Sequence, residues 1–180
     1  MTNLLVVDDE VNVVSALRRM LLNAAAPPVL RDPQLTACTS PVQALEHVAN
    51  HRVDLVISDY RMPVMDGVSF LTRVKELQPD TARIILSAFA DMEAIVRAIN
   101  EAGIFRFVSK PWSDAELKAI VAQVLAHREL LVENRRLADQ VRCQKGVISQ
   151  QQLELARLEA ESPGITRVRW TEDGGVLLEG

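Results

Sequence analysis

The chain has 180 residues, of which 48% are hydrophobic, and a formal net charge of −4 at pH 7. This length fits one ordinary domain with an appendage, and the acidic balance excludes the basic footprint of a nucleic-acid-binding protein. Two cysteines, Cys38 and Cys143, are too few for a disulfide framework. The first residues lack the pattern of a signal peptide, and no apolar run approaches the roughly 18–20 residues that span a bilayer. We therefore expect a cytoplasmic protein with no membrane partner.

Short β-branched apolar runs alternate with amphipathic segments up to residue 127. The runs predict buried strands at 3–7, 53–58, 83–87 and 104–108, with a weaker strand at about 34–39. The amphipathic segments predict helices at about 11–24, 41–50, 67–77, 91–101 and 114–127. This alternation predicts a doubly wound, five-stranded parallel α/β sheet with helices on both faces. The proline-rich stretch 26–33 predicts a surface insertion before the second strand.

The last predicted helix does not stop at residue 127. From Ser113, a candidate N-cap, to about Glu161 the chain has no proline and one glycine, Gly146. Apolar residues at heptad spacing from about 127 onward predict a coiled coil, and Asn134 at an a position favours a parallel two-stranded pair. The seam includes Leu130, Leu137, Val141, Ile148, Leu155 and Leu158. A long solvated helix, or a linker from a larger protein, remains the alternative.

The last residues form a separate segment, 162–180. Ser162-Pro163-Gly164 ends the helix, and an Asp-Gly pair within 171–175 lies between two β-prone runs. This pattern predicts a β-hairpin. Because a lone hairpin is marginal in water, it would pack against a partner, and a frayed tail is the alternative. The expected organisation is an α/β domain at 1–127, a coiled-coil helix at 128–161 and the tail.

Acidic residues and one lysine follow three of the predicted strands. Asp8 and Asp9 end the first, Asp59 ends the third and Lys110 ends the fifth. Because the C-terminal ends of parallel strands share one edge, where ligands bind, these side chains should meet. Three acids and one amine predict a divalent-metal site with a chemically usable carboxylate.

Other short motifs occur in order with these residues, namely Met62-Pro63, Asp66-Gly67, Ser87-Ala88 and Lys110-Pro111. Together they make residues 2–127 resemble the receiver domain of two-component response regulators. The resemblance implies a flavodoxin-like fold and a phosphorylation-controlled switch that accepts a phosphoryl group on Asp59 from a histidine kinase. It implies no enzyme beyond self-phosphorylation and autodephosphorylation.

The resemblance also assigns roles within the site. Mg²⁺ would be bound by Asp8, Asp9, Asp59 and the backbone carbonyl of Arg61. Lys110 and Ser87 would contact the phosphoryl group, and the Lys110–Pro111 bond would be cis. Phe107 would be the aromatic residue that turns inward on activation. Ser87 replaces the commoner threonine, and Phe107 lacks the tyrosine hydroxyl found in many relatives.

Two other enzyme classes are excluded by particular residues. A phosphatase of the haloacid dehalogenase type needs a second aspartate two positions after its nucleophile, where this chain has Arg61. A nucleotide-binding α/β domain would have a glycine-rich first turn, where this chain has Asp8-Asp9-Glu10. Both alternatives are therefore set aside.

The output of the switch is less defined by the sequence. Residues 101–107 and 110–112 resemble a receiver subgroup often joined to HD-GYP phosphodiesterase domains or other outputs, and no recognition helix follows residue 127. The first hypothesis is a dimeric regulator that acts on an unknown downstream protein. The alternative is the regulatory fragment of a larger cyclic-dinucleotide phosphodiesterase.

Overall fold

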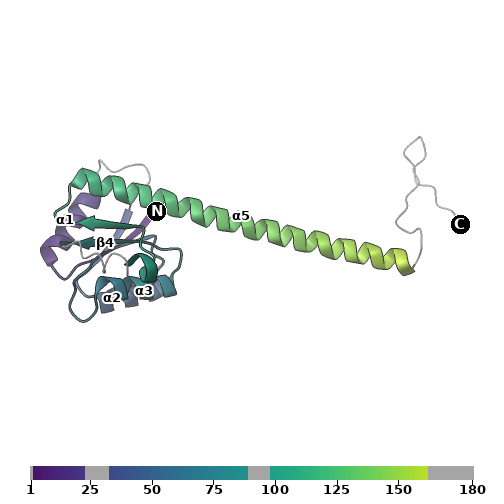
Figure 1. Ribbon diagram of the computed structural model, residues 1–180, viewed down its shortest axis with the longest axis horizontal. Coiled ribbons are helices and arrows are strands. Elements are labelled where there is room, and N and C mark those ends of the chain that lie inside the picture. Colours follow the sequence, from purple (N-terminus) through teal and green to yellow (C-terminus); the bar gives the residue numbers. More distant parts are fainter. Residues whose placement is uncertain (1, 23–32, 89–97, 162–180) are drawn as a thin grey trace. The chain divides into compact units, whose positions relative to one another are not determined.

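The computed structural model describes residues 2–22, 33–88 and 98–161. In these residues, five parallel strands form one sheet in the order β2-β1-β3-β4-β5. The strands are β1 (Thr2–Val7), β2 (Pro33–Cys38), β3 (Leu55–Asp59), β4 (Ala82–Ser87) and β5 (Arg106–Ser109). The helices are α1 (Val11–Leu21), α2 (Pro41–Asn50), α3 (Gly67–Leu77) and α5 (Asp114–Glu161), with a short π-helical turn, η2 (Ala98–Ala102). Helices lie on both sides of the sheet, α1 and the start of α5 on one and α2 and α3 on the other (Figure 1). The predicted doubly wound, flavodoxin-like sheet with a long C-terminal helix is confirmed.

Most predicted elements occur within a few residues of their expected bounds. The strand β3 begins at Leu55 rather than at residue 53, because the Val53 amide donates to the Gln78 side chain instead of the sheet. Residues 23–32, most of the predicted helix 91–101 and the predicted hairpin at 162–180 lie outside the described residues.

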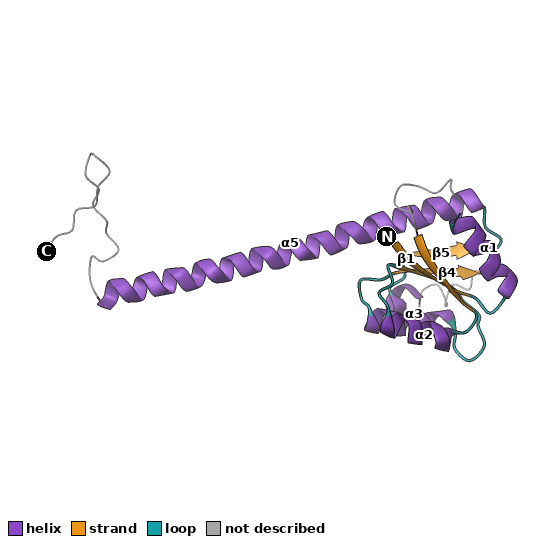
Figure 2. Ribbon diagram, turned by 180° about the vertical axis from the view of Figure 1, so that it is seen from behind, coloured by secondary structure: helices purple, strands orange, loops and turns teal. Residues whose placement is uncertain are grey.

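Alternate residues of the strands serve two separate cores, as a buried parallel sheet requires. Leu4 and Val6 face one cluster, to which α1 and the first turns of α5 contribute. Leu5 and Val7 face the other, which α2 and α3 cover. Figure 2 shows these two helical layers on opposite faces of the sheet. Both cores are built from hydrophobic side chains, and the buried acids Asp8 and Asp59 lie at the C-terminal ends of β1 and β3.

The helix α5 belongs to two compact units, Met1–Val132 and Glu133–Gly180. In the first unit, Leu117, Val121, Val124 and Leu125 are buried against the sheet. In the second, every side chain from Glu133 to Gly146 is exposed. Within the described residues, no helix combines the length and apolar character that crossing a bilayer requires.

Candidate phosphoacceptor site

The ends of β1, β3 and β5 bring three predicted site residues together. The Lys110 Nζ lies 2.7 Å from Asp8 Oδ2 and 2.6 Å from Asp59 Oδ1. One ammonium group therefore bridges the carboxylates of Asp8 and Asp59, which lie close together. In the sheet, β1 has β2 on one side and β3 on the other, so the order of the strands reverses at β1. Ligands of such open α/β sheets usually bind at the C-terminal ends of the strands beside this reversal.

The site buries more negative than positive charge. The side chains of Asp8, Asp59 and Lys110 are 1%, 8% and 16% exposed. Burial raises the pKa of Asp8, although hydrogen bonds from Lys110 and the Glu10 amide oppose this rise. Burial alone would lower the pKa of Lys110, but the hydrogen bonds and charges of Asp59 and Asp8 raise it overall. Lys110 therefore stays charged, and one cation serves two buried acids.

Backbone amides hold the second oxygen of each carboxylate. The Arg61 amide donates to Asp59 Oδ2 at 2.7 Å, and the Glu10 amide donates to Asp8 Oδ1 at 3.0 Å. Each carboxylate is thus fixed by Lys110 on one oxygen and by an amide two residues later on the other. The Arg61 main chain lies beside the phosphoacceptor candidate.

The loop after Asp59 is built around Asp66 and Gly67. Asp66 caps α3, accepting from the Ser69 amide at 2.8 Å, while the Gly67 amide donates to the Tyr60 carbonyl at 2.8 Å. A Cβ atom at Gly67 would collide with the backbone carbonyl oxygen of Asp59. The Asp66-Gly67 motif therefore lets the loop return tightly onto the end of β3.

The two predicted switch residues lie on the neighbouring strands. Ser87 is 3% exposed at the end of β4, and its carbonyl accepts from the Lys110 amide at 2.7 Å. Phe107 is half-buried on β5, opposite Ile85 of β4, and contacts the core on the α2 and α3 side. The backbone thus links Ser87 directly to Lys110. The Lys110–Pro111 bond is cis, as predicted.

The predicted metal ligands are only partly gathered. Asp8 and Asp59 share Lys110, whereas Asp9 is exposed. Among the described residues, no three His, Cys, Asp or Glu side chains are close enough to hold a metal. The donor set still fits Mg²⁺, because these are oxygen ligands and the buried pair of acids carries one negative charge that Lys110 leaves unbalanced. Binding would require the Lys110 ammonium to share the carboxylates with the ion.

A match to a known family covers most of the chain. The family model described as "Response regulator receiver domain" matches residues 4–122. The chain is 34% identical over 145 residues to the hydrogenase transcriptional regulatory protein HoxA of Bradyrhizobium diazoefficiens, covering 81% of this chain and 28% of HoxA. This match is longer than the unit Met1–Val132, so it extends into the exposed part of α5.

Other relatives have different outputs. The cyclic di-GMP phosphodiesterase response regulator RpfG of Xanthomonas campestris pv. campestris is 34% identical over 131 residues, covering 71% of this chain and 32% of RpfG. A crystal structure of the receiver domain of an HD domain-containing protein from Pseudomonas fluorescens Pf-5 is similar with a TM-score of 0.65. It is 36% identical and covers 73% of this chain and 92% of that one. The chain spans under a third of the two curated relatives, and it belongs to the response regulator receiver domain family.

Proposed function

We propose that the chain is a phosphorylation-controlled switch in which Asp59 accepts a phosphoryl group from a histidine kinase. The observation that carries this proposal is the Lys110 ammonium, which contacts both Asp59 and Asp8 at one edge of the sheet. A nucleophilic carboxylate beside a fixed cation is suited to phosphoryl transfer, which depends mainly on positioning and on charge stabilisation. The free thiols Cys38 and Cys143 support action in the reducing cytoplasm.

In this proposal, an Asp59 oxygen attacks the phosphorus of a phosphohistidine. The O–P bond forms as the P–N bond breaks, and the imidazole leaves with the bonding electron pair and takes a proton from water. The product is an aspartyl phosphate, which water later returns to the carboxylate and inorganic phosphate. Lys110 can follow the charge onto the phosphoryl oxygens, because its ammonium has three rotatable donors. The reaction needs no side-chain base on this chain.

Asp8, Asp9, Asp59 and the backbone carbonyl of Arg61 are the proposed ligands of Mg²⁺. Held by these oxygen ligands, Mg²⁺ would supply positive charge to offset the charge of the phosphoryl group. The amides of Glu10 and Arg61 hold Asp8 and Asp59 in place for this role. Asp9 would turn inward from its exposed position.

Ser87 and Phe107 are proposed to report the new charge. The Ser87 hydroxyl would donate to a phosphoryl oxygen, and the space released would allow Phe107 to turn inward. The hydrogen bond from the Lys110 amide to the Ser87 carbonyl supports this coupling, because it ties the end of β5 to the end of β4. The charge change would thereby reach the surface of β5 and α5.

Labelling by acetyl phosphate tests the proposal. We expect wild-type protein with Mg²⁺ to gain one phosphoryl group by intact mass, and Asp59→Asn to gain none. Asp139→Asn is the matched control, because Asp139 is an exposed carboxylate on α5 that pairs only with Arg142 among the contacts described. Unlabelled wild type, or equal labelling of Asp59→Asn, would refute the assignment of Asp59.

We also propose that α5 pairs with a second copy as a parallel coiled coil. Leu130, Leu137, Val141 and Leu155 are 65%, 48%, 48% and 53% exposed. They recur at heptad spacing, so two helices in parallel would bury them against each other. Asn134 would fix the register.

A second candidate is that the chain is the regulatory part of a longer protein, including a cyclic-dinucleotide phosphodiesterase. The lengths of RpfG and HoxA favour it, because the matched regions are 32% and 28% of those proteins. The reading frame beyond codon 180 distinguishes the candidates: a stop codon there supports the dimeric regulator, and a following catalytic domain supports the longer protein.

A further inference from the structure

The end of the domain opposite Asp59 holds a second ion pair between the sheet and α5. Arg128 Nη2 lies 2.8 Å from Asp54 Oδ1, and the two side chains are 13% and 14% exposed. The Arg128 Nε also donates to the Asp80 carbonyl at 2.7 Å. We call the contacts of Arg128 with Asp54 and Asp80 the basal clasp. It lies where the helix changes from buried to exposed, since Leu125 is 4% exposed and Leu130 is 65% exposed.

Asp54 connects α5 to the interior strands. Its Oδ2 accepts from the Asn3 amide at 2.8 Å, and its own amide donates to the Asn3 carbonyl at 2.8 Å. Its carbonyl accepts from the Ala82 amide at 2.9 Å. One residue thus joins the starts of β1 and β4 to Arg128, so the clasp is anchored to the backbone of two strands.

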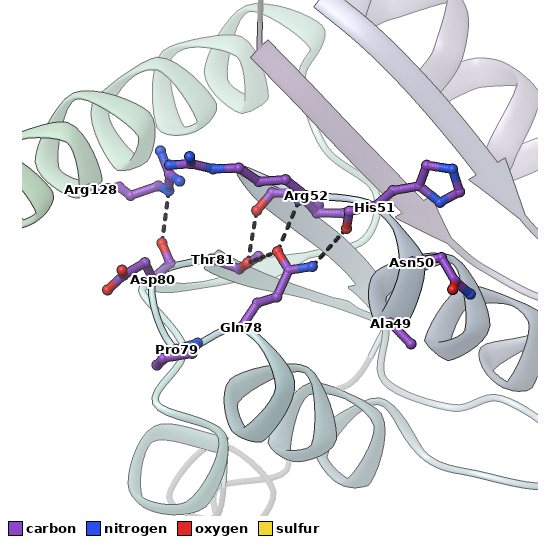
Figure 3. Close-up of a pocket in the computed structure, with 10 residues that line it drawn as sticks. Ala49, Asn50, His51, Arg52, Gln78, Pro79, Asp80, Thr81 and Arg128 are labelled. Atoms are coloured by element: carbon purple, nitrogen blue, oxygen red, sulfur yellow. Dashed lines mark hydrogen bonds between the residues drawn. The ribbon is translucent and has the colours of Figure 1, made fainter.

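A hydrogen-bond network around Gln78 and Thr81 lies beside the contact between Arg128 and Asp80 (Figure 3). The Gln78 amide nitrogen donates to the carbonyls of Val48 and His51 at 2.6 and 2.7 Å, and its oxygen accepts from the Val53 amide. The Thr81 hydroxyl donates to the Val53 carbonyl at 2.8 Å. His51, Val53, Gln78, Thr81 and Arg128 are among the residues that line a cavity of about 450 Å³. Val53 and Thr81, the chain neighbours of Asp54 and Asp80, are therefore joined to each other and to Gln78.

The clasp and the phosphoacceptor site lie at opposite ends of the same strand. Asp59 ends β3 and Asp54 directly precedes it. Their cationic partners come from different places in the chain, since Lys110 lies four residues before the first residue of α5 and Arg128 lies within the helix. One ion pair thus lies at each end of β3, from Lys110 after β5 at one end and from Arg128 of α5 at the other. Only the Lys110 pair contains the carboxylate that would change chemically.

We propose that the basal clasp is the fixed point through which the receiver controls α5. Phosphorylation of Asp59 draws Lys110 toward the phosphoryl group and moves the start of α5, while Arg128 keeps residues 124–132 on the sheet. The helix then tilts about Arg128 and passes the change to residues 133–146. This coupling rests on the proposed function of Asp59, whereas the holding role of Arg128 does not.

Hydrogen–deuterium exchange of the full chain tests both roles. The peptides of interest cover 124–132 and 133–146, with and without Mg²⁺ and beryllium fluoride, which forms an acyl-phosphate mimic on aspartate. For Arg128→Gln we expect exchange at 124–132 to rise about tenfold without the mimic, because a partly buried charged contact is lost. We expect the mimic to change exchange at 133–146 in the wild type and to have at most half that effect in the variant. Asp54→Asn should behave like Arg128→Gln.

Arg136→Gln is the matched control, because Arg136 is 67% exposed on the same helix and its ion pair with Glu133 measures 3.9 Å. Labelling by acetyl phosphate, read by intact mass, shows that each variant is folded. Wild-type exchange in both Arg128→Gln and Asp54→Asn would overturn the clasp. An undiminished response to the mimic at 133–146 in these labelled variants would overturn the coupling. Failure of the wild type to label would remove the proposed function and the coupling with it, and the exchange at 124–132 without mimic would still decide the holding role.

Discussion

Gly67 lies directly against the backbone carbonyl oxygen of Asp59, so closely that no side chain fits between them. The contact joins the first residue of α3 to the last residue of β3. The position of Asp59 is therefore fixed by the packing of Gly67 against its backbone as well as by the ion pair of its side chain with Lys110.

Gly67→Ala should destabilise the receiver and impair labelling of Asp59. The added methyl group meets backbone atoms, which cannot rotate away as a side chain could. We therefore expect the free energy of unfolding to fall by about 2–4 kcal/mol. Urea unfolding and acetyl phosphate labelling measure the two effects. Gly146→Ala is the control, because nothing lies within 4 Å of its Cβ position. It should leave receiver stability and labelling unchanged and raise the stability of the helix by about 1 kcal/mol. Equal effects of the two variants would contradict the close contact.

Asp8→Asn should stabilise the fold while weakening phosphorylation. Burial raises the pKa of Asp8 above its ordinary value of 3.8, so the folded protein holds this proton more tightly than the unfolded chain does. Protonated Asp8 therefore adds to the free energy of unfolding at pH values below 3.8, the pKa in the unfolded chain. This contribution is lost as the pH rises from there through the higher pKa of the folded protein. Relative to the wild type, Asp8→Asn should thus gain stability across that interval, by roughly 1 kcal/mol at neutral pH. Urea unfolding at several pH values checks this, and a variant less stable than wild type at pH 7 would contradict it.

Lys110→Met should make the domain depend on Mg²⁺ for stability. Removing the ammonium leaves Asp8 and Asp59 buried without a counter-charge, which should cost about 3–5 kcal/mol. If these acids form the metal site, Mg²⁺ should raise the melting temperature of Lys110→Met more than that of the wild type. Lys145→Met, which replaces an exposed lysine on α5, is the control. Identical melting shifts with Mg²⁺ for wild type and Lys110→Met would argue against the metal site.

Residues 1–132 should be monomeric and the full chain dimeric at tens of micromolar. The shorter chain keeps the basal clasp and the buried turns of α5 but lacks most of the exposed heptad seam. Asn134→Leu should raise the stability of the oligomer while allowing other oligomeric states, because the buried amide no longer selects one register. Light scattering measures the mass of each form. A monomeric full chain would contradict the coiled coil.

The five strands of the parallel sheet and the candidate site at their ends could be predicted because both follow from short local patterns. Asp59 and Lys110 stand out, since a buried apolar run ends in a charged residue at each position. The two-residue alternation of Leu4 to Val7 is hidden in a continuous apolar run, because both faces of the sheet are covered. The periodicity therefore indicates a buried strand without showing which helix covers which side.

The basal clasp could not be predicted in this way. Asp54 falls inside an apolar run, and Arg128 lies among other polar residues on a helix, where charge ordinarily indicates a solvated face. Their contact depends on where α5 crosses the sheet, which no local pattern encodes. Likewise, the Asp66-Gly67 motif is visible in the sequence, but the collision that requires glycine involves the carbonyl of a residue on another element.

The unbroken course of α5 from Asp114 to Glu161 has a consequence for how such a chain can be extended or shortened. Each residue inserted into an α-helix turns everything beyond it by about 100° and advances it by about 1.5 Å. Deleting or adding one residue between Glu133 and Gly146 would thus rotate the apolar stripe away from its heptad partners, whereas adding one full heptad would nearly preserve its direction. The rotation of an output domain about the helix axis, more than its distance along the helix, would decide whether a grafted output domain responds to the receiver.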